Sequence, residues 1–152
     1  MTRLLLEQRN FMVETSQERV WRLIGKAIFS CLPGMENIEI LDENNFRALL
    51  KTPVLGFHVP LKLTGEIVEM EPPDSFSVRL FLEGPGRLFK AEQKVAFIMT
   101  PVEEGKTSVV CKATAENLEF LPRLFFIGQA RRFARSTFEA IEKRLKEDFL
   151  SH

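Results

Sequence analysis

The stretch RLFKAEQKVAFIMT, Arg87 to Thr100, alternates apolar and polar residues along almost its whole length. Successive side chains of a strand point to opposite faces of a sheet, so this alternation predicts a strand with one buried and one solvated face. Lys90, Glu92 and Lys94 fall on the solvated side. The buried side has a single polar member, Gln93, and carries Phe89, Ala91, Gln93, Val95, Phe97 and Met99.

Other segments show the same alternation, and short clusters of turn-forming residues separate them. The clusters read DENN, GF, EPPD, GPG and VEEGK. Links of this length join antiparallel neighbours, because a parallel connection needs a crossover of about a dozen residues or more. With a first strand over residues 4–14, they predict an antiparallel meander of six or seven strands. The further segments are Ile38–Leu41, Phe46–Val54, Phe57–Met70, Ser75–Glu83 and Thr107–Glu116.

Two helices are predicted beside these strands. The sequence TSQE, Thr15 to Glu18, has the spacing of a capping box and predicts a helix start with Thr15 as the cap. Pro33-Gly34 ends this helix, since proline removes a backbone donor and glycine readily takes the positive φ of a helix exit. Apolar residues at steps of three and four predict a C-terminal helix from about Leu121 to Phe149. Its stripe contains Ile127, Ala130, Ala134, Phe138, Ile141, Leu145 and Phe149.

These elements predict a single α+β domain over residues 1–152. A curved antiparallel sheet of six or seven strands grips the long C-terminal helix, with a short helical segment after the first strand. The apolar face of such a sheet must be covered, and the C-terminal helix is the candidate cover. The curvature of the sheet then determines whether the space between the two is filled or remains a pocket.

Composition narrows the classes of function. Lysine plus arginine and aspartate plus glutamate each number 21, and the absence of a long single-sign run gives no reason to expect nucleic acid. The two cysteines and two histidines have no metal-ligand spacing, so no metal or other cofactor is expected. The apolar part of the start, MTRLLLEQRNF, is too short for a secretory or membrane-spanning segment, which favours a cytoplasmic protein, either soluble or peripheral at the inner face of the membrane.

Four short segments carry a likeness to a known group of proteins: Glu18–Trp21 (ERVW), Cys31–Glu36 (CLPGME), Lys51–Gly56 and Gly128 in the last helix. With the order of elements, they resemble the helix-grip superfamily of START domains, Bet v-type pollen allergens and polyketide cyclases. Within it, the chain is most similar to the CoxG family of carbon monoxide dehydrogenase subunits. The resemblance implies a cavity for a hydrophobic ligand between sheet and helix, and a role in bringing a partner enzyme to the membrane.

The inward residues of the sheet are the candidate walls of this cavity, with a hydrophobic small molecule such as a lipid or quinone as ligand. A buried amide without a partner costs about 1–3 kcal/mol, so Gln93 either bonds a neighbouring protein group or contacts a ligand head group. Arg131 is the second candidate polar contact. The predicted ligand-binding residues are Leu61, Leu63, Val78, Leu80, Gln93, Val95, Phe97, Val109, Cys111, Ile127 and Arg131.

A second candidate surface lies on the C-terminal helix, where FLPRLFFIGQARRFARSTF, Phe120 to Phe138, carries arginines and no acid. The arginines are either simply solvated or contact an anionic membrane or a partner. Arg131 and Arg135, one turn apart, could clamp an anionic head group together. Gly128 within the helix suggests a close approach to the sheet or room for a ligand. The predicted surface comprises Arg123, Phe126, Arg132, Phe133 and Arg135.

The leading functional prediction is non-catalytic binding or carriage of a hydrophobic small molecule, as a free-standing protein or as an accessory to a dehydrogenase. Cys31 falls on the apolar face of the first helix, so packing is favoured over a nucleophilic role. One rival is an enzyme resembling cyclases or hydrolases, which would need charged residues pointing inward. The other rival is a protein that recruits a partner or binds a membrane through its basic helix.

Overall fold

The computed structural model describes residues 4–31, 35–54, 57–84, 90–118 and 123–150. Within these ranges, the structure describes the backbone alone at residues 26–31, 35, 50–54, 57–60, 90–91, 117–118, 123–127, 129 and 148–150. The elements are β1 (Leu4–Val13), α1 (Gln17–Cys31), β2 (Met35–Ile40), β3 (Asn45–Val54), β4 (Phe57–Glu71), β5 (Ser75–Glu83), β6 (Lys90–Glu103), β7 (Lys106–Leu118) and α2 (Arg123–Leu150).

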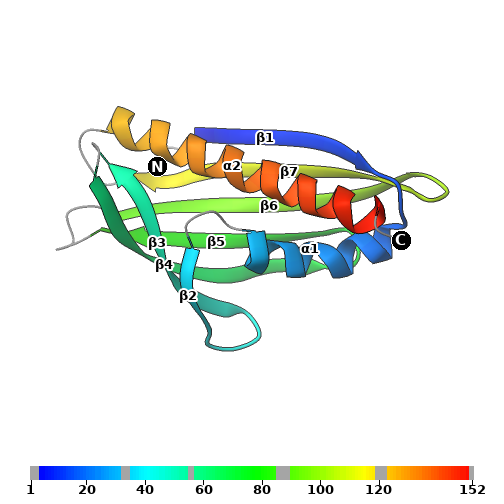
Figure 1. Ribbon diagram of the computed structural model, residues 1–152, viewed down its shortest axis with the longest axis horizontal. Helices are drawn as coiled ribbons and strands as arrows, with labels where there is room; N and C mark the ends of the chain where they lie inside the picture. Colours follow the sequence, from blue (N-terminus) through cyan, green and yellow to red (C-terminus); the bar gives the residue numbers. More distant parts are fainter. Residues whose placement is uncertain (1–3, 32–34, 55–56, 85–89, 119–122, 151–152) are drawn as a thin grey trace.

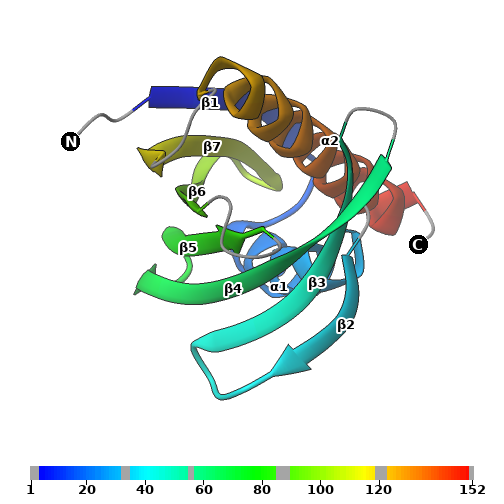
Figure 2. The same ribbon diagram turned by 90° about the vertical axis from the view of Figure 1, so that its left-hand side faces the viewer.

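All of these strands form one antiparallel sheet in the order β1-β7-β6-β5-β4-β3-β2. Strands β2 to β7 are a meander, and β1 closes the far side by pairing with β7. Figures 1 and 2 show the sheet curving around α2, which crosses its concave face, while α1 lies near one end. The predicted α+β fold, with a curved sheet gripping a C-terminal helix, is confirmed, and the sheet has seven strands.

Five β-bulges in the described pairing contribute to this curvature, including one in β2 and one near the end of β6. The pairing shifts by one residue between Leu5 and Glu7 in β1, between Ile67 and Glu69 in β4, and opposite the Glu92–Gln93 step of β6. A bulge bends its strand and increases the local twist, which lets a sheet wrap around a helix instead of lying flat beneath it.

The start of α1 differs from the prediction by one residue. The backbone N–H of Arg19 donates to Ser16 Oγ at 3.3 Å, so Ser16 caps the helix and the assignment of this role to Thr15 is wrong. Thr15 is held in the preceding turn instead: its N–H donates to the Val13 carbonyl at 2.9 Å, and its own carbonyl accepts from Thr107 Oγ1 at 2.7 Å. Either residue type can cap a helix, so the sequence alone did not separate them.

The core lies between the concave face of the sheet and the two helices. Phe138 of α2 is fully buried, and its ring meets Phe97 of β6 edge-to-face at a centroid distance of 6.2 Å. Phe97 stacks on Phe76 of β5 at 4.8 Å, and Phe76 contacts Trp21 of α1 at 5.5 Å. Aromatic pairs of this kind contribute about 0.5–1.5 kcal/mol each beyond the area they bury. This row of rings joins both helices to the middle of the sheet.

Candidate functional site

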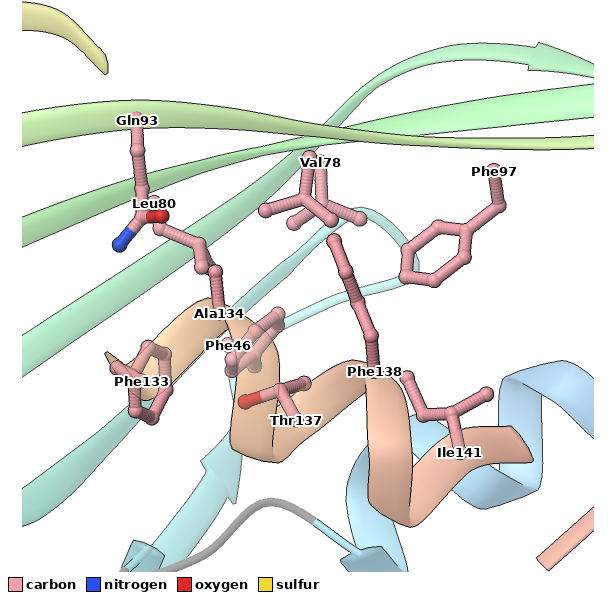
Figure 3. Close-up of a pocket in the computed structure, with 11 residues that line it drawn as sticks. Phe46, Val78, Leu80, Gln93, Phe97, Phe133, Ala134, Thr137, Phe138 and Ile141 are labelled. Carbon is pink, nitrogen blue, oxygen red and sulfur yellow. The ribbon is translucent and has the colours of Figure 1, made fainter. Parts of the chain in front are cut away.

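A cavity of about 30 Å³ lies between α2 and the strands β5 and β6. Figure 3 shows side chains from the sheet and from the helix pointing into it. A space of this size holds about one water molecule, and it is far too small for a whole lipid in this conformation. The lining residues are Phe46, Val78, Leu80, Gln93, Val95, Phe97, Phe133, Ala134, Thr137, Phe138 and Ile141.

The spacing of the lining residues follows from their secondary structure. On β5 and β6 they occur at every second position, because alternate side chains of a strand share a face. On α2, Ala134, Thr137, Phe138 and Ile141 recur at steps of three and four, which places them on one face of the helix. The space exists where the small residue Ala134 faces the sheet, between the larger Phe133 and Phe138.

Phe46 of β3 reaches the cavity because its strand partner is a glycine. Phe46 is paired with Gly65 of β4, and a Cβ atom built on Gly65 would overlap the Phe46 ring. The ring therefore lies flat over the glycine and is buried, being only 3% exposed. Gly65 acts here through its lack of a side chain and not through an unusual backbone angle.

Two buried oxygen atoms of lining residues have no hydrogen-bond partner among the described protein groups. Gln93 is 3% exposed and its Oε1 atom is unpaired; Thr137 is 6% exposed and its Oγ1 atom is unpaired. Gln93 comes from β6 beside the bulge in β7, and Thr137 comes from α2 on the opposite side of the cavity (Figure 3). Buried polar atoms are usually paired, so two unpaired atoms at one small cavity are an unusual combination.

The structure places the predicted ligand-binding residues in three groups. Val78, Leu80, Gln93, Val95 and Phe97 line the cavity. A second group, Leu61, Leu63, Val109 and Cys111, is buried in the core but does not belong to the lining. The Ile127 side chain is outside the described residues, and Arg131 is exposed, with Nη2 3.5 Å from the Leu5 carbonyl oxygen.

The lining also contains residues that the sequence did not assign to it. Ala134, Phe138 and Ile141 belong to the predicted apolar stripe of the C-terminal helix, so their inward direction was readable although their contact with a cavity was not. Thr137 could have been found from its position three residues after Ala134, and Phe46 from its alternation with Ala48. Whether a gap remains between inward side chains depends on how they pack, and no pattern in the sequence shows that.

The predicted surface on the C-terminal helix is divided by the fold. Arg132 is exposed, whereas Phe133 is half-buried and lines the cavity, so its assignment to an outer surface is corrected. Arg135 is exposed and is bound to Glu7 of β1. The side chains of Arg123 and Phe126 are outside the described residues. Gly128 is exposed, and nothing lies within 4 Å of a Cβ built on it, so the suggestion of a close approach to the sheet is wrong.

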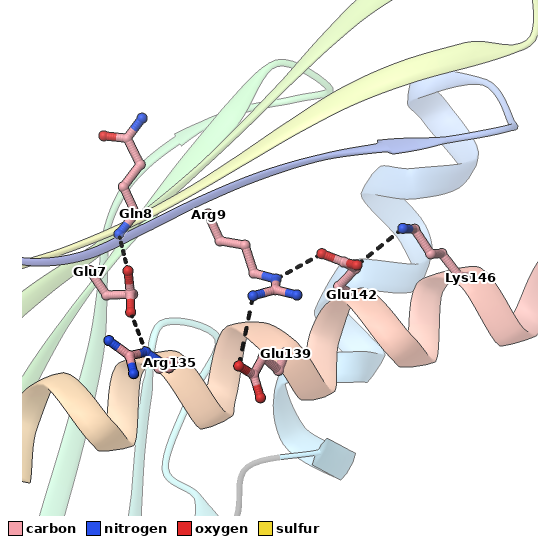
Figure 4. Close-up of polar contacts among 7 residues, drawn as sticks. All are labelled: Glu7, Gln8, Arg9, Arg135, Glu139, Glu142 and Lys146. Atoms are coloured by element: carbon pink, nitrogen blue, oxygen red, sulfur yellow. Dashed lines mark hydrogen bonds and ion pairs between the residues drawn. The ribbon is translucent and has the colours of Figure 1, made fainter.

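A cluster of charged residues joins α2 to β1, and we call it the β1–α2 ion-pair cluster (Figure 4). Arg9 Nε donates to Glu142 Oε1 at 2.7 Å, and Arg135 Nε donates to Glu7 Oε2 at 2.9 Å. Arg9 also lies 3.8 Å from Glu139, and Lys146 Nζ donates to Glu142 at 3.0 Å. Because Arg135 is engaged in this way, the structure does not present Arg131 and Arg135 as a ready-made clamp for an anion.

The ion pairs shift the pKa values of both carboxylates in the same direction. The hydrogen bond from Arg135 holds the pKa of Glu7 below its ordinary value. Burial alone would raise the pKa of Glu142, but hydrogen bonds from Arg9 and Lys146 outweigh it and leave that pKa lowered as well. Glu7 and Glu142 therefore keep their charge to lower pH than ordinary glutamates, and their ion pairs weaken when acid protonates them.

Cys111 is fully buried on β7, and burial raises the pKa of its thiol to about 12. A neutral thiol among apolar neighbours is a packing group, because the thiolate is the nucleophilic form. The side chain of Cys31 is outside the described residues. Within the described ranges, no cluster of three or more metal-binding side chains occurs, and no helix is both long and apolar enough to cross a bilayer.

Solved structures with a similar fold cover almost the whole chain. A conserved protein from Geobacillus kaustophilus has a TM-score of 0.73 at 16% identity, covering 92% of this chain and 94% of its own. A START superfamily protein from Mycobacterium smegmatis has a TM-score of 0.63 at 16% identity, with 93% and 97% covered. An aromatase/cyclase from a Streptomyces species has a TM-score of 0.68 at 13% identity, with 95% and 94% covered. At these identities the likeness shows the fold alone.

The sequence itself gives the more specific assignment. No curated protein sequence matches the chain significantly. The CoxG family of carbon monoxide dehydrogenase subunits matches residues 10–145, from the middle of β1 to the last turns of α2. The match covers most of the chain, and the protein therefore belongs to the CoxG family of carbon monoxide dehydrogenase subunits.

Proposed function

We propose that this protein binds a hydrophobic small molecule, such as a lipid or a quinone-like compound, between α2 and the strands β5 and β6. The observation that carries the proposal is the apolar cavity at this position, with two unpaired polar atoms in its wall. Small-molecule sites typically combine an apolar wall with a few polar groups that orient the ligand. Gln93 and Thr137 are the polar residues of the lining, whereas Arg131, predicted beside Gln93, is exposed and is not part of it.

A ligand larger than a few atoms must enlarge the cavity from its volume of about 30 Å³. The side chain best placed to move is Phe133, because it lines the cavity and is only half-buried. Phe97 and Phe138 are instead held by their edge-to-face contact in the row of rings. Rotation of Phe133 toward solvent would extend the space along α2 without breaking the core. A solved norcoclaurine synthase from Thalictrum flavum, with the same fold at a TM-score of 0.70 and 13% identity, is described in complex with dopamine and hydroxybenzaldehyde, which supports binding of small molecules by this architecture.

The proposal is tested by filling the cavity. Ala134 is 3% exposed and faces the space, so Ala134→Leu should occupy it and weaken binding of the fluorescent probe N-phenylnaphthylamine about tenfold or more. Ser136→Leu is the matched control, since residue 136 lies on the exposed side of the same helix. Native mass spectrometry of the purified protein should also reveal a bound apolar compound that Ala134→Leu lacks. Equal probe binding by the wild type and the Ala134→Leu variant would contradict a ligand at this position.

The family match supports a second proposal, an accessory role toward a dehydrogenase at a membrane surface or in a complex. Arg132 is the exposed arginine of α2 to test, because Arg135 already binds Glu7 and its replacement would disturb the β1–α2 ion-pair cluster. Arg132→Glu should reduce binding to anionic vesicles, with Lys143→Glu on the same helix as the control for an equal change of charge. If the two variants bind equally well, the basic region around Arg132 has no special part in recruitment.

A further inference from the structure

The cavity offers no polar surface to a ligand, although two of its lining residues are polar. The exposed surface inside the space is wholly apolar. Gln93 Oε1 and Thr137 Oγ1 are buried behind it, so neither oxygen contributes to that surface. A water molecule could not bridge to an entering group either, because it needs two or more polar partners of its own. A polar group that entered would therefore lose its hydrogen bonds to water without replacing them.

The way into the cavity lies on one side of α2. Of the described lining residues, Phe133 is half-buried and the others are buried. Arg131 and Arg135 lie two positions before and after Phe133, and two residues of a helix are turned by about 200°, so both arginines point to the opposite side. That opposite side is held against β1 by the ion pair of Arg135 with Glu7. A ligand would therefore enter beside Phe133, away from the β1–α2 ion-pair cluster.

We propose that the ligand is an amphiphile that inserts an unsubstituted hydrocarbon end into the cavity and leaves its polar end in solvent beside Phe133. This inference rests on the proposed function and adds the orientation of the ligand and the chemical class of its buried end. The hydrocarbon end gains van der Waals contacts with the rings and aliphatic side chains of the lining. Specificity then depends on where the polar group lies along the ligand and much less on which polar group it is.

The inference is tested by competition between two isomers of one diol. Vicinal octanediol has both hydroxyls at one end and a free hydrocarbon tail, whereas α,ω-octanediol has a hydroxyl at each end. Each isomer is titrated against bound N-phenylnaphthylamine. We expect the vicinal isomer to bind at least about fivefold more tightly, the smallest ratio that burial of one unpaired hydroxyl should produce. A smaller ratio, or tighter binding of the α,ω-isomer, would overturn the inference.

Ala134→Leu shows whether this preference comes from the cavity. Its added carbon atoms occupy the space, so neither isomer can insert an end and the ratio should fall below about twofold. Ser136→Leu, on the exposed side of the same helix, should keep the wild-type ratio. A preference that persists in Ala134→Leu would reflect only the general hydrophobicity of the isomers, and would overturn the inference.

The position of the polar end is tested by giving it a charge. If this end stays in solvent, octanoate should displace the probe with an affinity within about tenfold of that of vicinal octanediol, because its carboxylate keeps its hydration. A carboxylate drawn into the cavity would lose far more, since the described lining residues include no cation. A loss of affinity larger than about tenfold would overturn the inference.

The two proposals fail in different ways. If N-phenylnaphthylamine does not bind, or if Ala134→Leu does not affect it, the proposed function fails and this inference fails with it. If the probe binds at the cavity but the two diols compete equally well, only the orientation of the ligand is overturned.

Discussion

Replacing Gly65 by alanine should move the Phe46 ring and reduce both stability and ligand binding. The Cβ atom added at residue 65 would overlap three carbon atoms of that ring, which is buried against the cavity. The backbone of Gly65 does not have the positive φ that glycine alone adopts readily, so an alanine is accommodated there except for the ring. Phe46 lines the cavity, so a displaced ring can change the shape of that space.

The size of the effect is the difference between two opposing contributions. Overpacking of a well-packed core costs about 1–3 kcal/mol. Removing a glycine from the interior of a strand gains about 0.5–1 kcal/mol, because alanine loses less conformational freedom on folding. The difference lies between about 0 and 2.5 kcal/mol, and its midpoint of about 1 kcal/mol lowers the Tm of a chain of this size by about 2–4 °C.

Urea unfolding of the variants measures this loss, and Gly128→Ala is the control. Residue 128 is exposed in α2 with open space around its Cβ, so the same substitution there should stabilise by about 1 kcal/mol. Phe46→Leu in the Gly65→Ala background shortens the clashing side chain and should restore much of the stability, a coupling that a double-mutant cycle detects. A Gly65→Ala variant as stable as the wild type, with unchanged probe binding, would refute the idea that this glycine positions the Phe46 ring.

Three further predictions concern the core and the ion pairs. Phe138→Ala should destabilise by about 3–5 kcal/mol in urea unfolding, and small apolar ligands should recover part of the loss by occupying the enlarged space. In a Cys31→Ser background, Cys111 should resist alkylation at pH 8 until urea unfolds the chain. Because burial raises the pKa of its thiol to about 12, the thiol ionises first in the unfolded chain, and the free energy of unfolding should fall as the pH rises above about 9. Arg9→Met should cost about 1 kcal/mol at pH 7, and this cost should shrink as acid protonates Glu142, whose lowered pKa stabilises the folded state only while the carboxylate is charged.

The fold was readable from the sequence because its signals are local and repeated. Alternation in the segment from Arg87 to Thr100 identified β6 and its inward face, and the turn clusters placed almost every strand boundary within a few residues. On the strand side, the alternation of apolar and polar residues was enough to predict most of the cavity wall. On α2 the stripe gave the direction of Phe138 and Ile141, but the contribution of Thr137 depends on which helical position faces a gap, and that is set by the packing of distant residues.

Arginines were the least predictable part of the site, because the sequence shows their charge and not their partners. The nearest acid to Arg135 along the helix is Glu139, one turn away, yet Arg135 binds Glu7, which lies beside it once β1 pairs with β7. Arg131 likewise reaches the backbone of β1, at the Leu5 carbonyl oxygen. Contacts between the first strand and the last helix join the two ends of the chain, and no short-range pattern contains the information needed to foresee them.

The unpaired atoms of Gln93 and Thr137 favour the proposed binding site over a packing defect. A gap left by imperfect packing is usually lined by apolar groups alone, since an unpaired polar group in its wall would destabilise the fold with no return. Replacement of either residue by an apolar one of similar shape should therefore stabilise the protein. Residues that reduce stability in this way commonly serve function. Gln93 lies beside a β-bulge and Thr137 on the gripped helix, so both reduce stability at the place where we propose that the ligand binds.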